Sequence, residues 1–555
     1  MIRRGAATLL VSTAAVLPFE LRATLPVGPL RLSSVELFLY ATLALWSASR
    51  LAAPPSRREL LDPRRWPGLL QAAAVLALVM LLSAVRAPEL RGAALKFALR
   101  SLSGIGLAFA AADLLRAADT RARALTALIL GGLVAAVAVL VEARAPAAAA
   151  LWLRPFHEQT FETLGQVRGS GPFQFPNIAA MALEAAIPLA LVRAPAGAVA
   201  ALAMFFAVVA TGSRAGLVGS MAAVLAIAFI WMGRPASRRA GWVAALSLPV
   251  LLVAGVAANG TLTTRLRFWR EADWYRATIA PAGGPADRLP ARLVPGAPAS
   301  ELVTVTNRGT LAWRSVPPWP VALSYHWVDA DSGRIVERDG PRTPLPGDLP
   351  AGASATLRAA IHAPARPGRY LLWWDMVQED ITWFSARGDA GWREPVLVGD
   401  AAPAPGASPA VARLDDGVVP RRQLWGAALA MFRAHPLLGV GPDDFRHLYG
   451  RTLGLPAADD RLHANSLYFE TLADLGLGGV LAWGALLVAL ARAVRRALPQ
   501  PFAAGVAVAL GTFLLHGALD YFFAFTPTLV MFWLLVGALV ALDPQMSEPR
   551  REPAA

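Results

Sequence analysis

The organisation of the chain centres on the stretch Arg461–Gly479, which reads RLHANSLYFETLADLGLGG. It is a polar loop with one histidine, His463, and it runs directly into an apolar helical pattern. A turn-rich stretch, His435–Phe445 (HPLLGVGPDDF), lies upstream, and far earlier Thr211–Gly219 (TGSRAGLVG) opens another apolar helix. Polar stretches that border apolar helices therefore recur along the chain.

The composition is that of a polytopic membrane protein. Of the 555 residues, 56% are hydrophobic, and the mean hydropathy is +0.47. This profile excludes an ordinary soluble domain. The net charge of +14 comes almost entirely from arginine in short turns between apolar segments, which indicates topology-setting charge rather than nucleic-acid binding. The chain has no Cys, which excludes disulfides and thiol-ligated metal.

About twelve apolar segments are candidates for membrane spans. Arginines concentrate in alternate turns, for example at Arg64 and Arg123. This bias predicts cytoplasmic termini and places residues 260–475 outside. The first segment lacks a small-residue cleavage site, so we expect a retained anchor, with a signal peptide as the alternative. The candidate spans centre near Thr13, Leu43, Leu78, Leu107, Gly132, Ala185, Phe205, Val224, Val250, Ala485, Val508 and Phe532.

The pattern changes between Glu301 and about Val398. Short alternating runs such as Tyr370–Met376 are separated by turns such as Asn307–Gly309, which predicts a small antiparallel sandwich. Linkers rich in Pro, Gly and Ala are expected at 280–300 and 401–409. We expect the tryptophans to fill its core, with glycan stacking as the alternative. The tryptophans in this region are Trp313, Trp319, Trp327, Trp373, Trp374, Trp383 and Trp392.

The predicted fold is therefore mainly α, with about twelve transmembrane helices and an inserted extracytoplasmic all-β sandwich. The expected parts are residues 1–279 with nine spans and the start of the outer loop, 280–400 with the sandwich, 401–475 with an outer helical loop, and 476–555 with three spans and a cytoplasmic tail. The histidine motif lies in the third part.

Several cations lie where the charge bias predicts few. Arg214 opens an outer helix end, where it either snorkels into the headgroups or clamps a phosphate through its bidentate donors. Arg168 offers the same choice, and the nearby Asn177 is a plausible helix N-cap. Lys96 and Arg100 lie four residues apart, so they share one helix face and either line a polar cavity or snorkel.

Other cations lie in the large outer loop. Arg265, Arg267 and Arg270 are spaced so that one of them could lean over the membrane surface, and Arg422 follows the second linker. We treat Arg265, Arg267 and Arg422 as further candidates for binding a diphosphate, together with Lys96 and Arg100. The residues alone do not distinguish among the loop arginines.

His463 is the candidate base, because an imidazole accepts a proton near neutral pH. A structural role is the alternative. His516 and Asp520, four residues apart, either orient one another or pack as a pair. A metal site built from His447, Asp459, Asp460 and His463 matches no standard ligand spacing, so no metal is expected. The Gly439-Val-Gly441 sequence lacks a βαβ context and predicts a turn after a surface helix.

The stretches Thr211–Gly219, His435–Phe445 and Arg461–Gly479 together resemble the signature of the O-antigen ligase and polysaccharide polymerase (Wzy_C-type) superfamily of bacterial membrane glycosyltransferases. The resemblance implies that Arg214 binds a lipid-linked donor and that His463, in a His-x-Asn loop supported by Asn465, is catalytic. It also implies that no metal or other cofactor is needed. The inserted sandwich resembles the four-tryptophan class of Ig-like domains and departs from the plain family pattern.

The expected function is transfer of a glycan from a polyprenyl-diphosphate-linked donor to an acceptor hydroxyl, with inversion, on the outer side of a bacterial inner membrane. Arg214, Arg168 and a loop arginine would neutralise the diphosphate, and His463 would handle the acceptor proton. The acceptor is a glycan, a lipid or a protein, and membrane lipid surrounds the site. The alternatives are a polymerase that extends a lipid-linked glycan, and a non-enzymatic transporter or binding protein.

Overall fold

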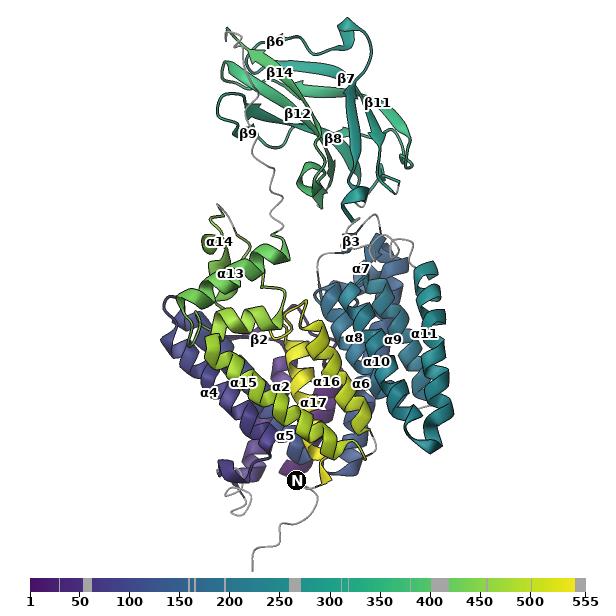
Figure 1. Ribbon diagram of the computed structural model, residues 1–555, viewed down its shortest axis with the longest axis vertical. Coiled ribbons are helices and arrows are strands. Elements are labelled where there is room, and N and C mark those ends of the chain that lie inside the picture. The colour runs from purple at the N-terminus through teal and green to yellow at the C-terminus, as the bar shows by residue number, and fades with distance from the viewer. Residues whose placement is uncertain are drawn as a thin grey trace, which may run out of the picture. The chain divides into compact units, whose positions relative to one another are not determined.

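A computed structural model gives the fold as two compact units, drawn in Figure 1. The helical unit comprises Met1–Phe161, Val167–Gly260 and Val419–Ala555, and the β unit comprises Glu162–Gln166 and Thr261–Val418. The residues that the structure describes are 1–28, 30–52, 62–157, 160–163, 166–193, 196–258, 271–310, 312–317, 319–379, 381–400, 419–455, 458–500 and 502–544.

Fifteen helices form the helical part of the chain in its described ranges. They are α1 (Ile2–Val16), α2 (Ser34–Leu51), α4 (Gly68–Arg86), α5 (Arg91–Leu114), α6 (Ala118–Arg144), α7 (Pro146–Leu153), α8 (Pro176–Leu191), α9 (Ala196–Thr211), α10 (Arg214–Met232), α11 (Arg238–Ala258), α13 (Arg421–Ala434), α14 (Phe445–Thr452), α15 (Leu467–Ala497), α16 (Ala503–His516) and α17 (Thr526–Ala541). Two two-stranded sheets lie between helices in the chain. One pairs β1 (Leu25–Val27) with β2 (Leu30–Leu32) in antiparallel fashion, and the other pairs β3 (Phe161–Thr163) with β4 (Gln166–Arg168).

Every predicted span centre lies in one of these helices, but only some helices are long enough to cross a bilayer unaided. Among the described residues, six helices have the required length and hydropathy: Gly68–Arg86, Arg91–Leu114, Ala118–Arg144, Arg214–Met232, Pro235–Gly255 and Leu467–Ala497. Helices α8, α9, α16 and α17 are apolar but shorter. A helix of 16 residues, such as α8, is about 24 Å long, against a hydrocarbon core of about 30 Å. The number of twelve spans stays a prediction.

Turns that the charge bias assigns to the same side of the membrane contact one another. On the predicted cytoplasmic side, Arg3 forms an ion pair with Asp113, at 3.0 Å, and Arg234 donates to the carbonyl of Leu498. On the predicted outer side, Arg22 donates its backbone N–H to the carbonyl of Pro155, at 2.9 Å. The helical unit therefore has two distinct ends, with the N-terminus at one and α13 and α14 at the other (Figure 1).

Glycines in the Thr211–Gly219 stretch let α10 pack closely on α8. A Cβ atom at Gly216 would lie 2.6 Å from the Cβ atom of Ala180, and one at Gly219 would lie 2.4 Å from Oε2 of Glu184. Both distances are shorter than van der Waals contact. This close approach fixes the start of α10, and with it Arg214, against the first turns of α8.

Two β-sheets build the β unit around a shared core. The larger sheet runs in the order β10-β8-β12-β14-β6, with β9 paired to β8 and β13 paired to β12, and the smaller runs β11-β7-β5. All pairs are antiparallel except β14 with β6. The strands are β5 (Ala277–Pro281), β6 (Arg292–Leu293), β7 (Pro298–Asn307), β8 (Val321–Asp329), β9 (Ile335–Glu337), β10 (Thr343–Pro344), β11 (Ser354–His362), β12 (Gly368–Gln378), β13 (Thr382–Trp383) and β14 (Trp392–Val398).

Strands β5 and β6 lie where the composition predicts a linker. Within β5, Ile279 is buried and pairs with Val305 of β7, and Leu293 of β6 also enters the core. The Pro and Gly residues nearby limit the length of these strands but do not prevent the strands from forming. The prediction of a linker over residues 280–300 was therefore wrong for the last two residues of β5, for β6 and for the start of β7. The described residues form a two-sheet sandwich, and its assignment to the Ig-like class stays a prediction.

Tryptophans fill the interior of this sandwich. Trp313, Trp327 and Trp374 are fully buried in the core between the sheets. On the opposite face of the larger sheet, Trp373 and Trp383 belong to a second buried cluster. Core packing is therefore confirmed for these five side chains, and Trp319 and Trp392 are partly buried.

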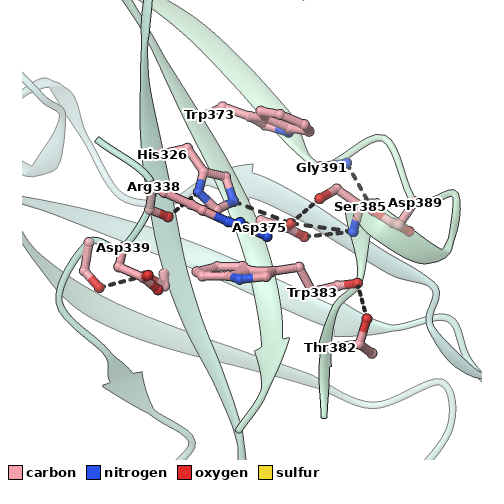
Figure 2. Close-up of polar contacts among 12 residues, drawn as sticks. His326, Arg338, Asp339, Trp373, Asp375, Thr382, Trp383, Ser385, Asp389 and Gly391 are labelled. Carbon is pink, nitrogen blue, oxygen red and sulfur yellow. Dashed lines mark hydrogen bonds and ion pairs between the residues drawn. The ribbon is translucent and has the colours of Figure 1, made fainter. Parts of the chain in front are cut away.

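The second cluster encloses a polar pair. The ring of His326 lies between Trp373 and Trp383 (Figure 2), with centroid distances of 5.2 and 4.2 Å. Its Nε2 atom lies 3.5 Å from Oδ2 of Asp375, which also accepts a hydrogen bond from the hydroxyl of Ser385. His326 and Asp375 are both fully buried. Because both serine and histidine bind the same carboxylate, the group is a buried bracing network and not a nucleophile–base pair.

We predict that stability of the β unit depends on pH through Glu301. Burial and the neighbouring Glu394 carboxyl raise the pKa of Glu301 to about 8, so the folded state keeps the proton that the unfolded chain releases at an ordinary pKa of about 4.3. Stability is therefore full below the unfolded pKa and falls as pH rises to about 8. Glu301→Gln removes this loss, so its unfolding temperature should exceed that of the wild type increasingly from pH 5 to pH 8.

Thermal unfolding of the full chain, followed by tryptophan fluorescence, measures this difference. Glu394→Gln removes the neighbouring charge but leaves Glu301 buried, so it should give a smaller pH dependence than the wild type. Identical pH dependence in the wild type and Glu301→Gln would contradict the assignment.

Candidate functional site

His463 lies in the loop between α14 and α15, bonded to a buried glutamate. Its Nδ1 atom is 2.7 Å from Oε1 of Glu470, whose other oxygen accepts the backbone N–H of Ala464 at 2.6 Å. Glu470 has no exposed surface. Because a carboxylate only accepts hydrogen bonds, Nδ1 carries a proton, and in the neutral form of the ring Nε2 has the free lone pair.

The backbone beside His463 is fixed from both sides. The carbonyl of Ala464 accepts the indole N–H of Trp425 at 3.0 Å, and the ring of Trp425 stacks on Phe469 at 4.9 Å. Asn465 adopts φ = 50°, a left-handed conformation that asparagine tolerates better than most residues. The asparagine of the motif thus has a conformational role beside His463, and its predicted supporting role stays a prediction.

Helix α13 supplies the surface on which this loop rests. Its apolar residues Leu424, Ala427, Ala428 and Met431 recur at helical spacing and are buried, whereas Arg422 is exposed. They share a core with Phe445 and Tyr449 of α14 and with Ala464. The amphipathic pattern therefore packs the described residues of 419–455 and 458–473 into a cap at one end of the bundle.

The environment of His463 favours its charged form. Burial disfavours the imidazolium, but the charge of Glu470 and its hydrogen bond outweigh burial and raise the pKa of His463 above its usual value. Asp443 acts in the same direction and Arg446 against it. A carboxylate that holds one ring nitrogen and raises the basicity of the other is the arrangement of a general base.

Helix α15 begins nine residues before the membrane segment that the sequence predicts, and it is broken at Gly476. Gly476 has φ = 59° and ψ = −153° inside the helix. The freed N–H groups of Leu477 and Gly478 donate to the carbonyls of Pro436 and Leu437, at 2.8 and 2.9 Å. The His435–Phe445 stretch therefore provides the hydrogen-bond acceptors for the backbone N–H groups that follow the break.

The same stretch also satisfies the carbonyls before the break. Val440 and Gly441 donate their N–H groups to the carbonyls of Ala473 and Asp474, both at 3.0 Å. Gly439 has φ = 68°, and a Cβ atom there would lie 2.2 Å from the carbonyl carbon of Asp474. The prediction that Gly439-Val-Gly441 merely ends a surface helix was thus incomplete, since this segment pairs with the broken helix.

Asp474 closes the arrangement. Its carboxylate accepts the backbone N–H groups of Asp443 and Phe445, at 2.7 and 3.0 Å. The hydroxyl of Ser83 in α4 donates to the carbonyls of Asp474 and Leu438. Asp474 and Ser83 therefore join α4, the 436–445 stretch and α15 at the base of the packed cap that contains His463.

Arg168 bonds to the segment that leads into α10, and Arg214 opens that helix. The Nε atom of Arg168 donates to the carbonyl of Thr211 at 2.8 Å, and its Nη2 atom donates to the side chain of Asn177 at 2.7 Å. Arg214 is the first residue of α10, whose N-cap Ser213 accepts the N–H of Gly216. Two arginines therefore belong to the surroundings of one helix N-terminus, whose dipole has the same sign as their charge.

Asn177 does not cap α8, so that prediction was wrong. The N-cap of α8 is Phe175 and Pro176 takes the first helical position, where its missing N–H costs nothing. The amide of Asn177 is instead a bridge, since it donates to Oδ2 of Asp520 at 3.1 Å while it accepts from Arg168.

His516 and Asp520 do not share a helix end. Helix α16 stops at His516, and Asp520 lies in the following loop. The Nδ1 atom of His516 is 2.9 Å from Oε1 of the buried Glu184 in α8. Each residue therefore bonds to α8, while the charge of Asp520 also acts on His516, and the pairing of the two stays a prediction.

The remaining predicted cations do not gather at one point. Arg100 donates to Glu36 at 3.2 Å, to the carbonyl of Ala524 and to the hydroxyl of Thr526, so it braces α2, α5 and α17. Lys96 and Arg422 are exposed. Arg265, Arg267 and Arg270 lie outside the described residues.

Two important acids escaped the sequence reasoning. Glu470 and Asp474 lie inside the quoted stretch, seven and eleven residues after His463, in an otherwise apolar run. Burial of a carboxylate in such a run costs free energy unless the carboxylate is hydrogen-bonded. The presence of acids in an apolar run was therefore the feature of the sequence that could have identified them. Glu184 could have been found in the same way within α8.

We predict that Gly476→Ala destabilises the protein whereas Gly484→Ala does not. A side chain at Gly476 faces a left-handed conformation, which costs about 1–3 kcal/mol, and its Cβ atom would lie 2.7 Å from the carbonyl oxygen of Pro436. Gly484 lies further along the same helix, and no atom comes within 4 Å of a Cβ atom there. Unfolding temperatures in detergent should therefore fall only for Gly476→Ala, and equal temperatures for both variants would refute the role of the break.

Comparisons with known proteins agree with the motifs. Residues 371–484, about a fifth of the chain, match the family described as O-antigen ligase. No curated protein matches. Among solved structures, an alkylpurine DNA glycosylase AlkC from Pseudomonas fluorescens, bound to DNA with an abasic site analog, aligns at 11% identity over 59% of this chain and 97% of its own. Its TM-score of 0.15 carries no structural argument. The resemblance predicted from the loop motifs is thus confirmed: residues 371–484 match the O-antigen ligase family.

Proposed function

We propose that the protein transfers a glycan from a polyprenyl-diphosphate-linked donor to an acceptor hydroxyl. The family match supports an enzyme of this general class in a membrane. The observation that carries the proposal is the hydrogen-bonded chain from Thr211 through Arg168, Asn177 and Asp520 to the backbone of Leu467. It joins Arg168 and the segment that leads to Arg214 to the start of α15, next to the loop of His463.

The arginines suit the leaving group. A diphosphate carries several negative charges, and a guanidinium provides permanently charged, paired donors that match its oxygens. Arg214 and Arg168 lie at a helix N-terminus, which itself favours anions. In the proposed reaction they bind the donor and neutralise the charge that develops as the sugar–phosphate bond breaks.

His463 suits the acceptor. In the proposed step the acceptor oxygen forms a bond to the anomeric carbon, and the bond from that carbon to the phosphate oxygen breaks. The electron pair of that bond leaves with the diphosphate, and the acceptor proton moves to Nε2 of His463. Glu470 then stabilises the imidazolium through Nδ1. A single displacement inverts the anomeric centre.

The same proposal covers location and topology. The charge bias and the contacts among the predicted inner turns support cytoplasmic termini, with the His463 cap on the outer face of a bacterial inner membrane. Residues of the protein alone handle the proton and the diphosphate in this mechanism, with no metal or other cofactor. A ligase uses a different acceptor from the donor, whereas a polymerase uses a second lipid-linked glycan, so product length separates the two.

Substitution of the two central residues should abolish transfer without unfolding the protein. Purified Arg214→Ala and His463→Ala in liposomes that contain a polyprenyl-diphosphate-linked glycan should each lose at least about a hundredfold in rate, because each removes a charge or base that acts in the transition state. Arg461→Ala, an exposed arginine in the same loop, should retain activity. Normal product from either central variant would rule out its assigned role.

The pH profile should report the carboxylate behind His463. Since Glu470 raises the pKa of His463, the wild type loses activity below that raised pKa, where the base is protonated. Glu470→Gln should lower the pKa, move the acidic limb of kcat/KM to lower pH and reduce the maximal rate by about tenfold to a hundredfold. An acidic limb at the same pH in both proteins would exclude His463 as the titrating base.

A further inference from the structure

One hydrogen-bonded bridge joins segments that lie far apart in the sequence. Asn177, at the start of α8, and Asp520, in the loop after α16, are 343 positions apart, yet their side chains are 3.1 Å from one another. The other end of the Asn177 amide accepts from Arg168 at 2.7 Å. The bridge therefore begins at one of the two arginines assigned to the donor.

The far end of the bridge supports the segment of His463. The carbonyls of Gly517 and Asp520 both accept the backbone N–H of Leu467, at 2.7 and 3.1 Å. The ring of Tyr521, the next residue, lies 5.0 Å from the ring of His463. The loop that carries Asp520 therefore contacts both the start of α15 and the ring of His463.

The bridge uses both functions of a carboxamide. The amide oxygen accepts from the guanidinium group while the amide nitrogen, a separate atom, donates to the carboxylate, so the two partners can lie on different sides of the group. An aspartate at position 177 would still accept from Arg168 but would face the carboxylate of Asp520 with a second negative charge. Asp520 is 8% exposed, so water would screen this repulsion poorly.

We propose that Asn177 and Asp520 are positioning residues that hold Arg168 in register with His463. The bridge sets the separation between the groups that bind the donor diphosphate and the base that activates the acceptor. Neither side chain needs to touch a reacting atom. The inference rests on the proposed transfer function. It adds a structural link between the arginine that binds the donor and the histidine that activates the acceptor.

Exchange of the two side chains provides the test. Asn177→Asp should lower kcat at least about tenfold, since small misplacements of reacting groups have large effects on rate, and should speed amide hydrogen exchange in residues 463–470. Asp520→Asn in the same chain restores complementarity, because the new amide donates to the carboxylate introduced at position 177 while Arg168 still donates to that carboxylate. In the double variant, kcat and the rates of amide hydrogen exchange in residues 463–470 should therefore both return to within about threefold of the wild-type values.

Two readouts separate this inference from the function itself. Absence of transfer by the wild-type protein would overturn the proposed function, while hydrogen exchange would still report the bridge. Wild-type kcat and exchange in Asn177→Asp, or a double variant no better than Asn177→Asp, would overturn the bridge. Should Asn177→Asp fail to fold, Asn177→Ala removes both hydrogen bonds without adding charge, and unchanged exchange in residues 463–470 would then overturn the bridge.

Discussion

The break in α15 at Gly476 is the constraint on which the candidate site depends. A helix interrupted near a membrane leaves N–H and carbonyl groups without partners, and such groups are expensive in an apolar environment. Here the backbone of residues 436–441 supplies the missing partners. The segment between α13 and α14 must therefore lie against α15, and Asp474 ties its continuation at residues 443 and 445 to the same helix.

From this constraint the geometry around His463 follows. With α13 and α14 held beside α15, Trp425 and Glu470 fix the two sides of Ala464, and Glu470 holds Nδ1 of the imidazole. The start of α15 rests on the loop after α16, which contacts α8 and so reaches the arginines. The β unit has its own core, and its buried histidine is braced within it (Figure 2).

Sequence reasoning predicted the elements better than the contacts. Apolar runs located the helices, alternation located the sandwich, and short motifs identified the family. The N-cap role of Asn177 was wrong, and the partners of His516 and Asp520 in α8 were not predicted, because they lie on segments hundreds of residues away and no local pattern encodes such pairing. Gly476 shows the same limit. In the sequence, a glycine at a helix start cannot be distinguished from a glycine at a helix break unless the segment that pairs with the break is known. Here that segment is Pro436–Gly441.

The most direct test of the account is a structure of the full chain in lipid nanodiscs with a polyprenyl diphosphate bound. The account predicts diphosphate density within hydrogen-bond reach of Arg168 or Arg214, at the same end of the helical unit as His463. Diphosphate bound at the opposite end, where Arg3 meets Asp113, or away from both arginines, would contradict it.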